Sequence, residues 1–209
     1  MVNSVLVEIS GAILAGGRSR RMGRDKATLP FRSKPLIAHV HGIVKEVLSE
    51  VFIVSKHHAA IEGVDSPILK DIIPLEGSLV GVASALLYAA TDYVFVFGGD
   101  MPFLRKEAII HMINQVHGED LVIPRTEAGY EPLHAVYRRS CLPHMLRAID
   151  HSRIKITGLL PYLSVKVIEA PLLFLNNGVS IFTNINTEED LALAERLISE
   201  RVDKGDERV

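Results

Sequence analysis

The chain alternates between short, mainly apolar runs and longer segments in which apolar residues recur every three or four positions. The short runs lie at residues 9–14, 51–54, 68–71, 93–97, 121–124 and 165–168. Runs of this kind are typical of strands buried on both faces. The segments with helical spacing lie at 35–48, 82–90, 106–116, 140–150, 155–163 and 188–201. The alternation predicts an α/β fold, a doubly wound three-layer α/β/α sandwich around a mainly parallel (mixed) sheet.

Two of the predicted helices carry start signals. Pro35 suits a first helical turn, where its missing N–H costs nothing. Thr187 with Asp190 three positions on is close to a capping box. We expect a single domain over residues 1–200 and a frayed tail over residues 201–209.

Composition narrows the class of protein. With 209 residues, 48% of them hydrophobic, the chain can bury a sizeable core. No apolar run approaches the roughly 20 residues of a membrane span, and the first residues lack the basic region of a signal peptide. The single cysteine, Cys141, excludes an intrachain disulfide and a cysteine-based metal cluster. These features predict a cytoplasmic protein that binds no membrane.

Positive charge is concentrated in one stretch. The formal net charge is only −2, which argues against a general nucleic-acid binder. Gly16 and Gly17 directly follow the first predicted strand, so the backbone can turn sharply and approach a ligand. The next residues hold one anion, Asp25, and five cations: Arg18, Arg20, Arg21, Arg24 and Lys26. The stretch matches neither the P-loop nor the dinucleotide fingerprint. It predicts a polyphosphate site, although a solvated basic loop stays an alternative.

Two carboxylates follow predicted strands. Ligands of open α/β sheets bind beyond the carboxyl ends of the strands, where Asp71 and Asp100 are expected. Asp100 stands in Gly98-Gly99-Asp100-Met101-Pro102, a sharp turn that suits a Mg²⁺ ligand. Each could instead be an ordinary turn residue. His57 and His58 are adjacent and fit no metal-ligand spacing, so we expect them on the surface.

The stretch from Leu14 to Lys26 resembles the signature of nucleotidyltransferases, and in particular the molybdenum cofactor guanylyltransferase family. Three later phrases resemble that family in the same order: Asp-x-Pro at 100–102, Pro-Leu-His-Ala-Val-Tyr at 132–137 and Asn-x-Asn-Thr-x-Glu-Asp-Leu at 184–191. The family's usual Gly-Pro-Leu is here Gly-Ser-Leu-Val-Gly, at 77–81. The resemblance implies a nucleotide-diphospho-sugar-transferase-like fold.

The resemblance also implies roles for individual residues. Asp100 would hold Mg²⁺ and act in catalysis with Lys26 and Arg21. The nucleotide would contact Leu14, Ala15, Gly16, Gly17, Lys26, Asp71 and Asp100. The acceptor would contact His134, Asn184 and Asn186. From the residues alone, His134 could equally be a packed histidine, and the two amides could merely tie their segment to the following helix.

The implied reaction transfers GMP from GTP to Mo-molybdopterin, giving molybdopterin guanine dinucleotide and pyrophosphate. Molybdoenzymes or their chaperones are the implied protein partners. Two alternatives stay open. One is a related transferase that uses CTP or another phosphorylated acceptor. The other is a non-catalytic nucleotide-binding regulator, which the presence of Lys26 and Asp100 argues against.

Overall fold

The structure is a computed structural model that describes residues 7–15, 29–56, 60–73, 75–169, 172–176 and 178–202. The glycine-rich loop, with the predicted residues Gly16, Gly17, Arg21 and Lys26, lies outside the described residues. His57, His58 and the last seven residues of the predicted tail lie outside them too.

The described chain builds one central sheet of eight strands, in the order β10-β7-β9-β6-β1-β4-β5, with β8 paired to β7. All pairs are parallel except those that β9 forms with β6 and β7 and the short pair of β7 with β8. The predicted mixed, mainly parallel sheet is therefore confirmed. Its strands are β1 (Ile9–Ala15), β4 (Val51–Ser55), β5 (Ile68–Lys70), β6 (Tyr93–Gly98), β7 (Leu121–Thr126), β8 (Gly129–Tyr130), β9 (His134–Arg138) and β10 (Val165–Ile168).

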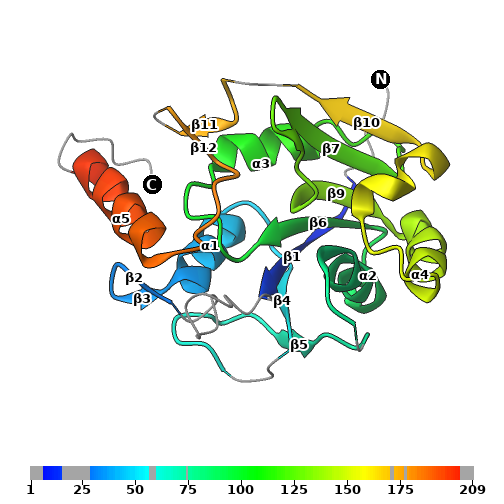
Figure 1. Cartoon of the computed structure of the whole chain (residues 1–209), viewed down its shortest axis with the longest axis horizontal. Helices are drawn as coiled ribbons and strands as arrows, with labels where there is room; N and C mark the ends of the chain where they lie inside the picture. The colour runs from blue at the N-terminus through cyan, green and yellow to red at the C-terminus, as the bar shows by residue number, and fades with distance from the viewer. Residues whose placement is uncertain are drawn as a thin grey trace.

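Helices cover both faces of this sheet, which gives three layers (Figure 1). One face packs against α1 (Leu36–Lys45) and α3 (Lys106–Ile113). The other packs against α2 (Ser78–Tyr88), α4 (Leu142–Asp150) and the 3₁₀ helix η3 (Ile156–Tyr162). A second 3₁₀ turn, η2 (Arg139–Cys141), leads into α4. None of the described helices is long and apolar enough to cross a membrane.

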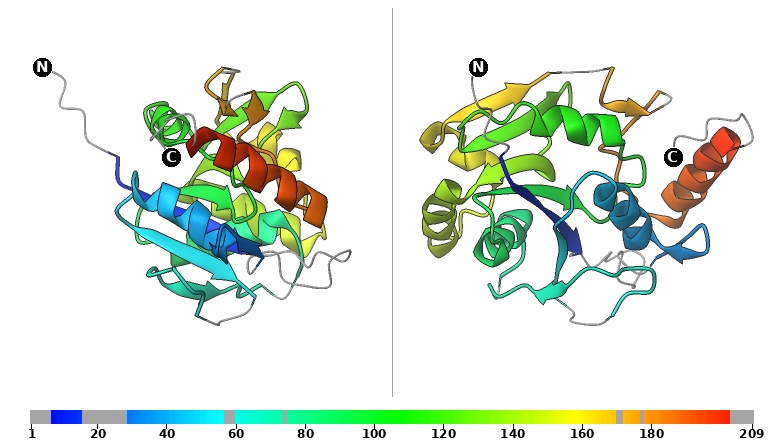
Figure 2. Two further views of the ribbon diagram at one scale, coloured as in Figure 1. Left: turned by 90° about the vertical axis from the view of Figure 1, so that its left-hand side faces the viewer. Right: turned by 180° about the vertical axis from the view of Figure 1, so that it is seen from behind.

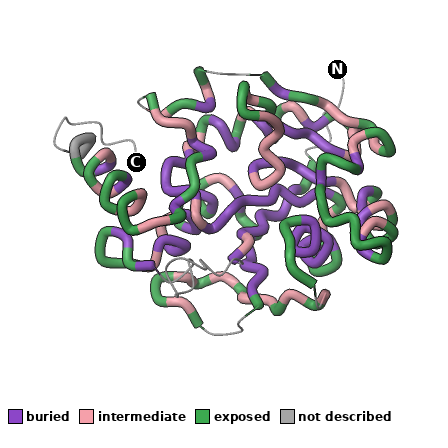
Figure 3. The backbone as a smooth tube through the Cα atoms, viewed as in Figure 1, coloured by how far each residue is buried: buried purple, intermediate pink, exposed green. Residues whose placement is uncertain are grey.

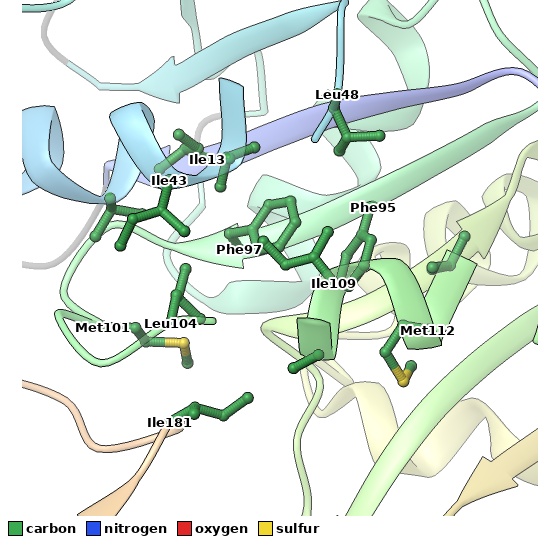
Figure 4. Close-up of a cluster of buried hydrophobic side chains, with 14 of the residues drawn as sticks. Ile13, Ile43, Leu48, Phe95, Phe97, Met101, Leu104, Ile109, Met112 and Ile181 are labelled. Atoms are coloured by element: carbon green, nitrogen blue, oxygen red, sulfur yellow. The ribbon is translucent and has the colours of Figure 1, made fainter. Parts of the chain in front are cut away.

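The central strand β6 shows why the strands are apolar throughout. Successive side chains of a strand point to opposite faces, so Phe95 and Phe97 enter the core under α1 and α3, while Val94 and Val96 enter the core under α2. The purple central strands in Figure 3 show this burial, and Figure 4 shows Phe95 and Phe97 beside Ile109 of α3. Both faces must be apolar because both are covered.

The last helix, α5 (Glu188–Val202), builds a third, smaller cluster at one side of the molecule (Figure 2). Its Ala194 and Ile198 belong to the same buried cluster as Phe31 of the hairpin β2 (Pro30–Phe31)–β3 (Lys34–Pro35). The expected capping box is confirmed: Thr187 N–H donates to Asp190 Oδ2 (2.9 Å), and Asp190 N–H donates to Thr187 Oγ1 (3.1 Å). The helix runs to Val202, into the predicted tail.

The structure corrects several predicted elements. Helix α2 begins at Ser78 rather than at residue 82, because the chain turns into it directly at Gly77, whose φ is 139°. Residues 156–162 form a 3₁₀ helix, and α3 ends at Ile113 instead of 116. The predictions missed β2, β3, β8 and a hairpin of β11 (Leu175–Asn176) and β12 (Val179–Ser180), because two-residue strands have no detectable periodicity.

Adjacent isoleucines on α3 test this packing. Ile109 is fully buried, whereas Ile110 is 47% exposed. Ile109→Ala should lower the free energy of unfolding by about 2–5 kcal/mol, because it leaves a cavity under the sheet. Ile110→Ala is the matched control and should lower it far less. Equilibrium unfolding in urea measures both, and equal losses would contradict the assigned faces.

Candidate nucleotide and acceptor site

The carboxyl ends of β1 and β6 meet at the centre of the sheet. Leu14 pairs with Gly98 in the parallel register, and the Gly99 N–H donates a hydrogen bond to the Leu14 carbonyl (3.1 Å). After β1 the next strand of the sheet is β4, on one side, and after β6 the next strand is β7, two places away on the other side. Such a topological switch point is where open α/β sheets bind ligands.

Gly99 allows a close approach at this junction. A Cβ atom there would lie 3.1 Å from the Leu14 carbonyl oxygen and 3.3 Å from the Ile37 side chain. Glycine therefore lets the turn after β6 press directly against the end of β1. The last described residues before the glycine-rich loop, Leu14 and Ala15, therefore lie at the Gly98–Asp100 turn.

Asp100 lies half-buried in that turn. Its carbonyl accepts a hydrogen bond from the Ile185 N–H (2.9 Å). This bond brings the segment before α5 against the Asp100 turn, although 85 residues separate the two in the sequence. The structure thus joins Leu14, Asp100 and the predicted acceptor segment at one edge of the sheet.

The two predicted acceptor amides share one side of this segment. Asn184 and Asn186 are exposed, while Ile185 between them is buried. The Asn186 Nδ2 donates to the Asn184 carbonyl (3.3 Å), so one amide also supports its own segment. The pattern of exposure puts both asparagines on the outer side of the segment, and their contact with an acceptor stays a prediction.

Asp71 follows β5, on the far side of β4 from β1. Its Oδ1 accepts hydrogen bonds from the Ser84 hydroxyl of α2 (2.7 Å) and from the Ile73 N–H (3.3 Å). The hydrogen bond from the Ile73 N–H is typical of a turn residue, the alternative role that the sequence left open for Asp71. These bonds fix the carboxylate at the carboxyl edge, and its contact with a nucleotide stays a prediction.

Three side chains that no sequence pattern indicated hold the loop after Asp100. His39 Nε2 lies 3.0 Å from the Pro102 carbonyl oxygen. The Asn176 Nδ2 donates to the Phe103 carbonyl (3.0 Å), and the Arg105 Nη1 donates to the Leu175 carbonyl (2.9 Å). Single polar residues within α1 and β11 give no motif, so only the folded structure reveals these contacts.

The residues around Asp100 fit a Mg²⁺ ion that takes most of its ligands from the nucleotide and water rather than from the protein. Among the described residues, no group of three or more His, Cys, Asp or Glu side chains could hold a metal ion. Mg²⁺ usually takes one or two carboxylates together with phosphate oxygens rather than a cage of protein ligands. A Cβ at Gly98 would lie 3.0 Å from Asp100 Oδ1, so glycine leaves room around the carboxylate.

The structure contradicts the predicted contact between His134 and the acceptor. We expected it to contact the acceptor, but the structure buries it completely. Its ring packs edge-on against Phe95, Phe97 and Phe182, with centroids 5.0–5.6 Å apart. Neither ring nitrogen has a hydrogen-bond partner among the described residues. Position 134 points into the core because it shares a face with Phe97, its partner in the β6–β9 pairing.

This burial makes His134 a source of acid sensitivity. Desolvation lowers the pKa of its imidazole from 6.5 to about 3. The unfolded chain therefore takes up this proton first, and the stability present above pH 6.5 is lost as the pH falls toward 3. The loss amounts to about 1.4 kcal/mol per pH unit. Urea unfolding at pH 7 and pH 5 should show a smaller pH effect in His134→Leu than in the unchanged protein; identical pH effects would contradict this origin.

Solved structures share the fold. The molybdopterin-guanine dinucleotide biosynthesis protein A from Archaeoglobus fulgidus superposes with a TM-score of 0.78 at 28% identity, covering 91% of this chain and 99% of that one. A CMP:2-keto-3-deoxy-manno-octonic acid synthetase superposes with a TM-score of 0.70 at 14% identity, covering 93% and 99%. The second shows the fold alone, that of the nucleotide-diphospho-sugar transferases.

Similar sequences extend over nearly the whole chain. A molybdenum cofactor guanylyltransferase from Desulfosudis oleivorans is 35% identical over 193 residues, covering 91% of this chain and 96% of the relative. A probable molybdenum cofactor guanylyltransferase from Natranaerobius thermophilus is 34% identical over 197 residues, covering 91% and 96%. The family model of the MobA-like NTP transferase domain matches residues 11–160. With the resemblance so confirmed, this chain belongs to the MobA-like nucleotidyltransferases, a family of molybdenum cofactor biosynthesis.

Proposed function

We propose that the protein transfers GMP from GTP to Mo-molybdopterin. In this reaction an oxygen of the acceptor's terminal phosphate attacks the α-phosphorus of GTP. A new P–O bond joins the two substrates, and the bond between the α-phosphorus and the bridging oxygen to the β-phosphate breaks. Pyrophosphate leaves, and molybdopterin guanine dinucleotide is the second product.

One observation supports this proposal most directly. Two backbone hydrogen bonds, from Gly99 N–H to the Leu14 carbonyl (3.1 Å) and from Ile185 N–H to the Asp100 carbonyl (2.9 Å), connect three parts of the chain. These are the root of the predicted phosphate loop, the proposed Mg²⁺ ligand and the acceptor segment. A transferase of this kind needs those three parts side by side, because its catalysis consists of positioning and charge neutralisation.

The nucleotide would lie over the carboxyl end of β1. Backbone N–H groups from Ala15 to Gly17 would cradle the phosphates, while Lys26 and Arg21 would neutralise their growing charge. The Leu14 backbone and Asp71 would contact the base and the ribose. The fixed Asp71 Oδ1, held by Ser84 at 2.7 Å, suits such a contact because it needs little reordering on binding.

Asp100 would hold Mg²⁺ together with oxygens of the triphosphate. When bound, the ion would act as a Lewis acid on the reacting phosphates. The chain's own contribution is to hold the Asp100 turn against β1 through Gly99. No covalent enzyme nucleophile is required, since the acceptor phosphate, whose second pKa is about 6, is already largely ionised at neutral pH.

The acceptor would lie on the side of Asn184 and Asn186, next to Asp100. Release of the product to molybdoenzymes or their chaperones, and a cytoplasmic location, complete the proposal. They rest on the family and on the single cysteine, which is buried and whose thiol donates to the Asp120 carbonyl (3.0 Å).

Pyrophosphate release with each of four nucleoside triphosphates, with and without Mo-molybdopterin, tests the function. We expect release only when GTP, Mg²⁺ and the acceptor are all present. Release with CTP instead of GTP would show that the nucleotide substrate is CTP, which contradicts the proposed use of GTP. If a nucleotide binds but no nucleotide gives pyrophosphate release, the protein would instead be a non-catalytic nucleotide-binding regulator.

Asp100→Asn tests the Mg²⁺ ligand. A neutral amide is a poorer ligand for a hard cation, so the variant should need far more Mg²⁺ and turn over about a hundredfold more slowly. Asp92→Asn is a matched control, because Asp92 precedes the same strand at its opposite end and pairs with Arg138 (2.8 Å). Mg²⁺ titrations of activity measure both. An unchanged rate and Mg²⁺ dependence in Asp100→Asn would leave Asp100 as a turn residue only.

Replacing Asn184 and Asn186 together with alanine tests the acceptor side. The double variant should bind GTP normally but bind Mo-molybdopterin about 1–3 kcal/mol more weakly, because the acceptor loses hydrogen-bond partners. Asn114→Ala, at the exposed end of α3, is the control. Calorimetry with each ligand and a melting curve separate the possibilities. Equal weakening of both ligands together with a lower melting temperature would show a merely structural role.

A further inference from the structure

The loop that carries Asp100 is anchored by its apolar side chains. Met101, Phe103 and Leu104 are each at most 4% exposed. Met101 and Leu104 enter the core under α1 and α3 (Figure 4), and Phe103 enters the cluster beneath α5. This packing fixes the path of the loop, but the orientation of its peptide groups depends on what binds their polar atoms.

The Pro102 carbonyl is held by His39 of α1, at 3.0 Å from Nε2. A carbonyl oxygen only accepts, so Nε2 must carry the proton. Burial lowers the pKa of His39, the hydrogen bond to Pro102 opposes this change, and nearby Arg32 adds to it. The neutral ring with its proton on Nε2 is thus favoured. The ring also packs against the Phe31 ring, 5.0 Å away and tilted by 57°, which helps to hold the imidazole in place.

The neighbouring Phe103 carbonyl is held from a different element. Asn176 of β11 donates its Nδ2 proton to this oxygen at 3.0 Å. The Arg105 Nη1 donates in the opposite direction, to the Leu175 carbonyl at 2.9 Å. The β11–β12 hairpin and the Asp100 loop are therefore joined by two side-chain hydrogen bonds, one from each partner.

We propose that His39 and Asn176 are positioning residues that set the direction of the Asp100 carboxylate. This inference rests on the proposed function. Three carbonyls of one short loop, those of Asp100, Pro102 and Phe103, each receive a donor from a different segment: Ile185, His39 and Asn176. Pro102 and Phe103 are buried, so losing a donor would remove a hydrogen bond from a buried part of the loop and weaken the hold on its orientation.

Side chains that orient a metal ligand affect metal binding strongly. Replacing such a partner commonly costs 10–100-fold in metal affinity or activity. His39 and Asn176 would act through the backbone of the loop that carries the ligand, so their loss should change Mg²⁺ dependence and turnover rather than acceptor affinity. A residue that only stabilised the fold would lower the melting temperature without this pattern.

Four variants test the proposal. His39→Leu and Asn176→Asp remove the donors, whereas His39→Gln supplies an amide N–H near the position of Nε2. His41→Leu is the matched control, because His41 lies on the same helix and its Nε2 contacts the Ser66 hydroxyl (2.8 Å), away from the loop. For each variant, the measurements are the melting temperature, the Mg²⁺ dependence of pyrophosphate release and the binding of Mn²⁺ in the presence of GTP.

We expect His39→Leu and Asn176→Asp to weaken Mn²⁺ binding and lower turnover by about 10–100-fold, with an unchanged KM for the acceptor. His39→Gln should recover most of the loss, and His41→Leu should show none of it. Unchanged Mn²⁺ binding in both donor-free variants would overturn the proposal, as would equal weakening in His41→Leu. Because Mn²⁺ binding needs no acceptor, it decides this proposal even if transfer to Mo-molybdopterin, and with it the proposed function, fails.

Discussion

The close approach of β1 and β6 at their carboxyl ends is the constraint on which the rest of the site depends. The Gly99 N–H donates to the Leu14 carbonyl, and a Cβ at residue 99 would lie only 3.1 Å from that oxygen, so glycine eases this approach. The contact places the turn with Asp100 beside the end of β1, the strand that precedes the glycine-rich loop in the sequence. A larger residue at position 99 would crowd the contact between the two parts that the proposed reaction must bring together.

The layers of the fold support this junction from both sides. On one face, Ile13 and Phe97 are buried with α1 and α3. On the other, α2 lies so close to β1 that a Cβ at Gly81 would be 3.0 Å from the Leu14 Cδ1. A tightly packed interior resists deformation, so the backbone around Leu14 and Asp100 is held rigidly. Rigid support suits a reaction that depends on positioning.

Much of this architecture was predictable from the sequence, because it rests on local signals. The apolar runs that became β1, β4 and β6 must be buried on both faces, and Thr187 with Asp190 marked the start of α5. Contacts between distant segments were not predictable. His134 gave no sign of which face of β9 it would occupy, so its burial among phenylalanine rings became clear only from the pairing of β9 with β6. The same holds for His39 and Asn176, whose carbonyl partners are 63 and 73 positions away in the sequence.

The antiparallel placement of β9 also depends on the whole fold. The phrase at 132–137 carries a resemblance to the family, but nothing in it sets the direction of a strand, which is decided by how the chain returns to the sheet between β6 and β7. The two-residue strands β11 and β12 form because their hairpin packs beside the Asp100 loop, through Asn176 and Arg105. Tertiary contacts, rather than local propensity, determine these parts.

A crystal structure of the protein with Mg²⁺ and a non-hydrolysable GTP analogue tests the central claim most directly. We predict that the triphosphate lies over the carboxyl end of β1, with the ion about 2.1 Å from a carboxylate oxygen of Asp100. The exposed side of Asn184 and Asn186 should be left open for the acceptor. A nucleotide bound elsewhere on the protein, or a metal ion at the triphosphate that Asp100 does not contact, would contradict the account.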